Sequence, residues 1–226
     1  MAESQALRVL VLASGTGSNL RALSGALDAS TGEAQICGVV SDRSDAKALV
    51  FAEERGWPTT VVRPKAFTDR TAWDTALAEA CAVLNPDLVV LAGFMRIVGA
   101  PLLERFPNRI LNVHPSLLPS FTGSDAPRQA LASGVRITGC TVHVVDAGLD
   151  SGPIVAQAAV PVAEGDTEET LHQRIQAAEH RLLPAVVLAV ASGELSLESP
   201  PRWRSARRSS DMMFAVPPLA PESPAR

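Results

Sequence analysis

An amide and an imidazole stand two residues apart near the middle of the chain, at Asn112 and His114, in the otherwise apolar run 110–114. In a β-strand, side chains two residues apart leave the same face. A carboxylate, Asp150, follows later in a glycine-flanked loop. Together these groups suit chemistry at a carbonyl carbon. The amide can donate to a developing oxyanion, the imidazole can move a proton, and the carboxylate can stabilise the charged imidazole.

A glycine-rich segment, Gly15-Thr-Gly-Ser-Asn19, follows the first apolar run and precedes a helical pattern. Glycines permit a sharp turn, and backbone N–H groups at a helix N-terminus favour an anion. The dinucleotide-binding fingerprint requires a third small residue where Leu20 stands, and the segment lacks the lysine of a Walker loop. The segment therefore favours a single phosphate group as ligand. A tight turn without a ligand is the alternative.

The composition limits the classes of function. The chain has 226 residues, 46% of them hydrophobic, and a formal net charge of −4. Its length suits one α/β domain or two small ones, and its charge argues against nucleic acid or an anionic membrane as partner. The N-terminus lacks a signal-peptide pattern and no run reaches the length of a membrane span, so we expect a cytoplasmic protein. Three cysteines without metal-ligand spacing predict buried thiols and no metal site: Cys37, Cys81 and Cys140.

Strand-like and helix-like patterns alternate along the chain. The expected strands are 7–13, 35–41, 59–62, 87–92 and 109–113, and the expected helices are 19–27, 46–55, 70–84 and 100–105. This alternation predicts an α/β fold with a Rossmann-like, mostly parallel sheet and helices on both faces. Two longer strands, 137–145 and 154–162, predict an antiparallel C-terminal addition. A capped helix is expected from 168 towards 191.

The last segment differs in composition, with six of the seventeen prolines and five arginines after residue 198. We therefore predict a single domain over residues 1–198. Residues 199–226 are expected to form a poorly ordered tail that lays at most a few residues against the domain.

Four motifs together carry a family resemblance: the glycine-rich segment, GFMRI at 93–97, NVHPSLLP at 112–119 and LDSGP at 149–153. With them, residues 7–195 resemble the folate-dependent formyltransferase superfamily, and the glycine-rich segment resembles its glycinamide ribonucleotide formyltransferase branch. The resemblance implies transfer of a formyl group from the co-substrate 10-formyltetrahydrofolate to the amine of 5-phosphoribosylglycinamide in de novo purine biosynthesis. It leaves open whether the protein is a monomer or a homodimer.

The resemblance also implies roles for particular residues. Asn112, His114 and Asp150 match the catalytic trio of the family. The groups that bind phosphoribosylglycinamide match three residues of the glycine-rich segment and a carboxylate facing the ribose hydroxyls: Gly17, Ser18, Asn19 and Glu179. The folate-contacting groups match a basic side chain near the glutamate tail, a four-residue segment whose backbone reads the pterin, and the catalytic amide: Arg70, Met95, Arg96, Ile97, Val98 and Asn112.

One loop departs from the family pattern. Family members commonly carry Pro-Gly-x-His after Leu-Leu-Pro, whereas this chain has Thr122 and Asp125 in place of that proline and histidine. The peptide bond between Leu118 and Pro119 is often cis in the family and is expected to be cis here. His143 lies inside an expected strand, where core packing is the simpler role and support of Asp150 the alternative.

In the implied mechanism, His114 is the general acid that protonates the leaving folate nitrogen. The attacking amine must be unprotonated, so activity should fall as the pH drops below neutrality. Methionyl-tRNA formyltransferase and formyltetrahydrofolate hydrolase are alternatives within the superfamily, but each requires a further domain. A non-catalytic nucleotide-binding module is a third alternative, and it would leave the Asn112, His114 and Asp150 set without a purpose.

Overall fold

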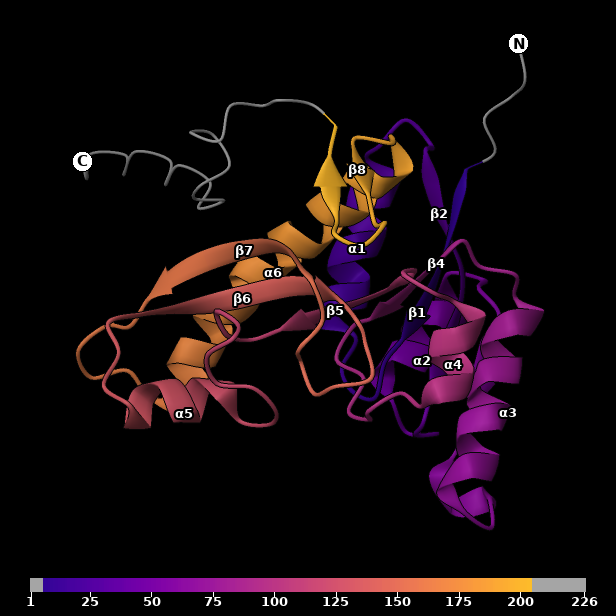
Figure 1. Cartoon of the computed structure of the whole chain (residues 1–226), viewed down its shortest axis with the longest axis horizontal. Coiled ribbons are helices and arrows are strands. Elements are labelled where there is room, and N and C mark those ends of the chain that lie inside the picture. The colour runs from indigo at the N-terminus through magenta and orange to yellow at the C-terminus, as the bar shows by residue number, and fades with distance from the viewer. Residues whose placement is uncertain (1–5, 205–226) are drawn as a thin grey trace.

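A seven-stranded sheet forms the centre of the described part of the chain, residues 6–204 of this computed structural model (Figure 1). Its strands are β1 (Leu7–Leu12), β2 (Ala34–Ser41), β3 (Thr59–Val61), β4 (Leu88–Leu91), β5 (Ile110–His114), β6 (Ile137–Val144) and β7 (Ile154–Pro161). They lie in the order β3-β2-β1-β4-β5-β6-β7. The pairs from β3 to β5 are parallel, and the pairs β5–β6 and β6–β7 are antiparallel. The predicted fold class, including its antiparallel addition, is confirmed.

Helices cover both faces of this sheet, as predicted. They are α1 (Ser18–Asp28), α2 (Lys47–Glu54), α3 (Arg70–Val83), α4 (Ala100–Arg105), α5 (Ala126–Ala132) and α6 (Glu168–Ala191), with a 3-10 turn at Pro64–Ala66. Side chains alternate along β1, so that Val9 and Val11 pack with α1, α2 and α6. Leu10 and Leu12 pack with α3 and α4 on the other face, and Figure 1 shows these two helices side by side.

Helix α5 was not predicted. It has only seven residues, too few to show a helical hydrophobic period, and it begins at Ala126-Pro127. Proline is favoured in the first turn of a helix because its missing N–H would have no partner there. Pro184, by contrast, lies inside α6 without ending it.

The described C-terminal residues form a small hairpin, β8 (Leu195–Ser196) paired with β9 (Arg202–Trp203). The indole N–H of Trp203 donates to the carbonyl of Val155 on β7 at 3.4 Å. The first residues of the predicted tail thus contact the domain, while 205–226 lie outside the described residues. Among the described helices, none has both the length and the apolar character that crossing a membrane requires.

The strand order reverses between β1 and β4. The chain runs outward from β1 through β2 to β3, then returns to the other side of β1 with β4 and β5. In open α/β sheets, ligands bind outside the carboxyl ends of the strands at such a reversal. The glycine-rich segment follows β1 there, residues 93–98 follow β4, and His114 ends β5.

Candidate active site

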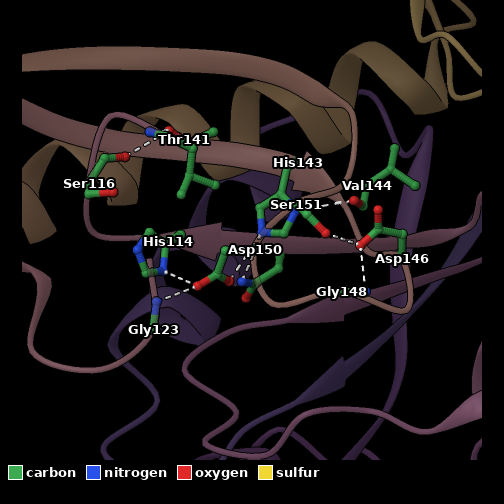
Figure 2. Close-up of polar contacts among 12 residues, drawn as sticks. His114, Ser116, Gly123, Thr141, His143, Val144, Asp146, Gly148, Asp150 and Ser151 are labelled. Carbon is green, nitrogen blue, oxygen red and sulfur yellow. Dashed lines mark hydrogen bonds and ion pairs between the residues drawn. The ribbon is translucent and has the colours of Figure 1, made fainter. Parts of the chain in front are cut away.

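The structure brings Asn112, His114 and Asp150 together. Strand β5 presents the amide and the imidazole on one face, and Asp150 reaches them from the loop after β6 with a left-handed φ of 52°. Its Oδ2 lies 3.4 Å from His114 Nδ1. Figure 2 shows the Asp150 carboxylate between the rings of His114 and His143. The geometry is that of the predicted cluster, and the catalytic role of each residue stays a prediction.

Both ring nitrogens of His114 face oxygen atoms. Nε2 lies 2.8 Å from the carbonyl oxygen of Phe121, and because a carbonyl only accepts, Nε2 carries a proton. A proton on Nδ1 would face the Asp150 carboxylate, which also accepts the backbone N–H of Gly123 at 2.8 Å. The ring is only 5% exposed, so water competes little for these contacts.

His143 belongs to this cluster, a position that the core-packing interpretation missed. In the antiparallel pairing of β5 and β6 it lies directly opposite Asn112. Its Nδ1 faces the carbonyl of Val144 at 3.1 Å, and burial lowers the pKa of the ring. The neutral ring therefore carries its proton on Nδ1, and Nε2 accepts from Asn112 Nδ2 at 3.1 Å. The same Nε2 lies 3.7 Å from Asp150 Oδ1.

The sequence does contain a signal for His143. Thr141 and His143 alternate with apolar residues in β6, whose side chains are almost all buried. Two polar side chains on one face of a buried strand require polar partners. Reading that signal requires the register of β6 on β5, which pairs His114 with Thr141 and Asn112 with His143.

Thr141 holds the turn that follows His114. Its hydroxyl donates to the carbonyl of Ser116 at 2.7 Å and accepts the N–H of Leu118 at 3.0 Å. The side chain of Gln157 on β7 donates to the carbonyl of Leu118 and to the same hydroxyl. The Leu118–Pro119 peptide bond is cis, as predicted.

The loop that departs from the family pattern is closed by its own hydrogen bonds. The amide of Gln129 donates to the carbonyls of Thr122 and Ser124 at 3.2 and 2.8 Å. Asp125 has a φ of 59° at the start of α5 and pairs with Arg128 at 2.6 Å. Gly123 lies between the two unusual residues and donates its backbone N–H to Asp150 at 2.8 Å.

The predicted phosphate-binding residues form the start of α1. Gly17 precedes the helix with a φ of 74°, and a Cβ there would lie 2.9 Å from Ala48, so this position requires glycine. The side chain of Gln176 on α6 donates to the hydroxyl of Ser18 at 3.0 Å. Backbone N–H groups at such a helix start suit a phosphate.

Asn19 and Glu179 form a buried pair beside this loop. Asn19 Nδ2 donates to Glu179 Oε2 at 2.9 Å. Burial raises the pKa of Glu179 to about 7, against the opposing effect of the Asn19 hydrogen bond. Asn19 Oδ1 is buried without a hydrogen-bond partner within residues 6–204. A buried acceptor that lacks a donor is a place for a hydroxyl or amine of a ligand.

Of the predicted folate-contacting residues, the segment 95–98 follows β4, Arg70 begins α3 and Asn112 lies on β5. Met95 and Ile97 are 76% and 55% exposed, and Val98 is buried. The guanidinium of Arg70 donates to the carbonyl of Ile97 and to both carboxylate oxygens of Asp74. Arg70 therefore contacts the predicted segment directly, although its side chain is engaged within the protein.

Two of the three cysteines are buried, as predicted, and Cys37 is half-buried. Burial raises the pKa of the Cys81 and Cys140 thiols to about 12. A thiol with such a pKa is not a nucleophile near neutral pH.

Comparisons with known proteins give the family. Residues 7–187 match the family described as formyl transferase. The chain is 52% identical over 187 residues to phosphoribosylglycinamide formyltransferase of Mycobacterium tuberculosis, covering 82% of this chain and 85% of that protein. It is 46% identical over 195 residues to the human trifunctional purine biosynthetic protein adenosine-3, covering 86% of this chain and 19% of that protein.

Solved structures agree with these relatives. Glycinamide ribonucleotide transformylase 1 of Symbiobacterium toebii is similar at a TM-score of 0.84 and 49% identity, over 89% of this chain and 95% of that one. Phosphoribosylglycinamide formyltransferase of Brucella melitensis is similar at a TM-score of 0.78 and 45% identity, over 83% and 97%. The chain therefore belongs to the formyl transferase family, in its phosphoribosylglycinamide formyltransferase branch.

Proposed function

We propose that this chain transfers the formyl group of 10-formyltetrahydrofolate to the glycyl amine of 5-phosphoribosylglycinamide, with Asn112, His114 and Asp150 at the reacting carbon. Membership of the branch supports the reaction, because the family uses 10-formyltetrahydrofolate as formyl donor. The observation that carries the assignment of residues is the Asp150 carboxylate, 3.4 Å from the His114 ring and 3.7 Å from the His143 ring that holds Asn112.

Asn112 is the group that meets the oxyanion. Attack of the amine on the formyl carbon gives a tetrahedral intermediate whose oxygen carries negative charge. The Asn112 amide has two N–H donors, and His143 accepts one of them. The second donates to the oxyanion, in an orientation that His143 fixes. Removing one such donor typically lowers the rate about 100- to 1000-fold.

His114 and Asp150 move the proton. The amine loses a proton after attack, and the folate nitrogen must gain one before it leaves. His114 Nε2 donates its proton to the carbonyl of Phe121, so this nitrogen does not serve the substrate. The leaving nitrogen therefore receives its proton from the side of the ring where Nδ1 faces Asp150, directly or through a water molecule. Positioned proton transfer of this kind contributes about 100- to 10,000-fold to a rate.

The two substrates bind at the two loops that flank the reversal of strand order, after β1 and after β4. The phosphate lies on the backbone N–H groups of Gly17, Ser18 and Asn19, and the ribose hydroxyls meet Glu179 and the unpartnered Asn19 Oδ1. The folate lies on the segment 95–98, with Met95 and Ile97 as its apolar contacts. Arg70 donates to the Ile97 carbonyl and so orients this segment. The same contact limits how far the Arg70 side chain can turn towards the glutamate tail of the folate. No step in this proposal uses a metal ion.

The experiment that tests the proposal compares formyl acceptors. The purified full chain is supplied with 10-formyltetrahydrofolate and, in separate reactions, with 5-phosphoribosylglycinamide, with aminoacylated initiator tRNA, or with water alone. We expect rapid formylation of phosphoribosylglycinamide only. Preferential formylation of the tRNA, or release of formate at a similar rate without an acceptor, would assign the chain to another activity of the superfamily.

A further inference from the structure

Asp42 is a buried carboxylate outside the residues described so far. It follows β2 at the carboxyl edge of the sheet, and its side chain is only 1% exposed. It accepts the hydroxyl of Ser14 at 2.6 Å and the Nε of Arg96 at 2.8 Å. A buried carboxylate is costly unless it is paired and hydrogen-bonded, and Ser14 and Arg96 provide these contacts for Asp42.

Ser14 extends this network to the predicted folate-contacting segment. Its hydroxyl accepts the backbone N–H of Met95 at 2.9 Å, and its own N–H donates to the carbonyl of Gly93 at 3.1 Å. Ser14 also directly precedes the glycine-rich segment. The loops that follow β1, β2 and β4 therefore meet at the Asp42 carboxylate.

The position of Arg96 shows what this network acts on. Its side chain is 49% exposed, although Asp42 anchors its Nε inside the protein. Its neighbours in sequence, Met95 and Ile97, are more exposed still. The segment 95–97 thus lies on the surface, where few packing contacts restrain it. Its backbone is held by Ser14 at Met95, by Asp42 through Arg96, and by Arg70 at Ile97.

We propose that Asp42 is a positioning residue for the folate co-substrate. Through Ser14 and Arg96 it fixes the backbone of 95–97 in the conformation that binds the pterin, and it sets that segment at a constant distance from the glycine-rich segment. Asp42 touches neither substrate. This inference rests on the proposed function, since it assumes that the segment 95–98 binds folate, and it extends that function to a residue outside the motifs.

The test uses two variants and a matched control. Asp42→Asn keeps an oxygen that accepts from Ser14 but turns an N–H donor towards Arg96 Nε, which breaks the charged bond. Ser14→Ala removes only the hydroxyl between Asp42 and the Met95 N–H. The control is Asp45→Asn, which breaks the nearby Arg43–Asp45 pair, a 2.8 Å contact between side chains that are 57% and 70% exposed.

We expect both variants to raise the KM for 10-formyltetrahydrofolate about tenfold, with kcat at saturating substrates within about twofold of the parent. Asp45→Asn should leave both constants unchanged. A purely structural role predicts instead a lower Tm with an unchanged folate KM. A folate KM within about twofold of the parent in Ser14→Ala and Asp42→Asn overturns the inference. If Asp42→Asn does not fold, Ser14→Ala alone decides.

Calorimetry separates this inference from the proposed function. The parent protein is titrated with tetrahydrofolate and with 5-phosphoribosylglycinamide, and both variants are treated in the same way. Loss of folate affinity in the variants supports the positioning role even if the parent transfers no formyl group. If the parent and both variants bind tetrahydrofolate with the same affinity, the positioning role is contradicted, whether or not the parent transfers a formyl group.

Discussion

Two carboxylates, Asp150 and Glu179, have different surroundings. The Asp150 side chain is 11% exposed, with an imidazole nitrogen at 3.4 Å, a second at 3.7 Å and a backbone N–H at 2.8 Å. Glu179 is buried with one neutral amide, Asn19, and burial raises the pKa of Glu179 to about 7. The first site surrounds the carboxylate with two imidazole rings and a backbone N–H group. The second leaves a carboxyl group that is half-protonated near neutrality.

The different surroundings of the two carboxylates suit different tasks: the cluster around Asp150 suits catalysis, and the site around Glu179 suits binding. The cluster around Asp150 uses side chains from the antiparallel part of the sheet, β5 and β6, and the loop after them. The site around Glu179 uses backbone N–H groups of α1 and side chains of α6. We therefore expect substitutions in the first site to change turnover, and substitutions in the second to change affinity or stability.

Asn112→Ala should have the largest effect on turnover among substitutions in the cluster around Asp150. Loss of the donor to the oxyanion is expected to lower kcat about 100- to 1000-fold. Equilibrium binding of phosphoribosylglycinamide, followed by calorimetry, should stay close to that of the parent. A loss of affinity in place of a loss of turnover would show that Asn112 acts in substrate binding and not in catalysis.

Ser18→Ala combined with Asn19→Ala should have the opposite pattern. The double variant loses the Ser18 hydroxyl beside the phosphate and the Asn19 amide that meets a ribose hydroxyl. At about 1 kcal/mol each, these losses weaken binding of the phosphorylated substrate roughly 10- to 30-fold. Turnover at saturating substrate should be retained. A kcat that falls with the Kd unchanged would contradict the division between the two sites.

His143→Phe tests the residue that the sequence analysis left to the core. A phenyl ring fills similar space but cannot accept from Asn112, so the amide loses its orientation. We expect kcat to fall about tenfold, since misplacement of a catalytic group by about 1 Å is costly. The thermal unfolding curve controls for packing. An unchanged kcat would return His143 to a purely structural role.

Glu179→Gln should change the pH dependence of stability. The folded protein keeps the Glu179 proton up to about pH 7, whereas the unfolded chain loses it near the ordinary value of 4.5. The folded state therefore binds more protons between these pH values, and this group lowers stability as the pH rises through the window.

The glutamine variant lacks this loss. Relative to the parent it should be equally stable at pH 4.5 and more stable at pH 8, by at least about 1 kcal/mol. Denaturant unfolding without ligands at both pH values measures the difference. An equal difference at both pH values would show that Glu179 is ionised in the folded protein as in the unfolded chain.

Much of this arrangement could be predicted from the sequence, because its signals are local. The spacing of Asn112 and His114, the glycines before α1 and the alternation of strands and helices each lie within a few residues. The role of His143 was predicted only as an alternative and that of Asp42 was missed, because both roles depend on partners far along the chain. Asn112 lies opposite His143 only through the register of β6 on β5, and Asp42 joins residues 14 and 96 only through the strand order.

The engagement of Arg70 escaped prediction for a similar reason. The sequence indicates a basic side chain at the start of a helix, and the structure adds that Asp74 and the Ile97 carbonyl occupy its guanidinium. The pairing with Asp74 is a local i, i+4 contact, but the second partner comes from the loop after β4. A basic residue that the sequence offers as a ligand contact can thus already be hydrogen-bonded within the protein.

Asp150→Asn isolates what the carboxylate beside His114 contributes to formyl transfer. Asparagine tolerates the left-handed φ of 52° at this position and can still accept the Gly123 N–H, so the loop should keep its shape. Only the negative charge beside His114 is removed. We predict that single-turnover formyl transfer slows by at least about 100-fold while the Kd for phosphoribosylglycinamide stays within about twofold. Transfer at the parent's rate would contradict the role of the Asp150 carboxylate in formyl transfer.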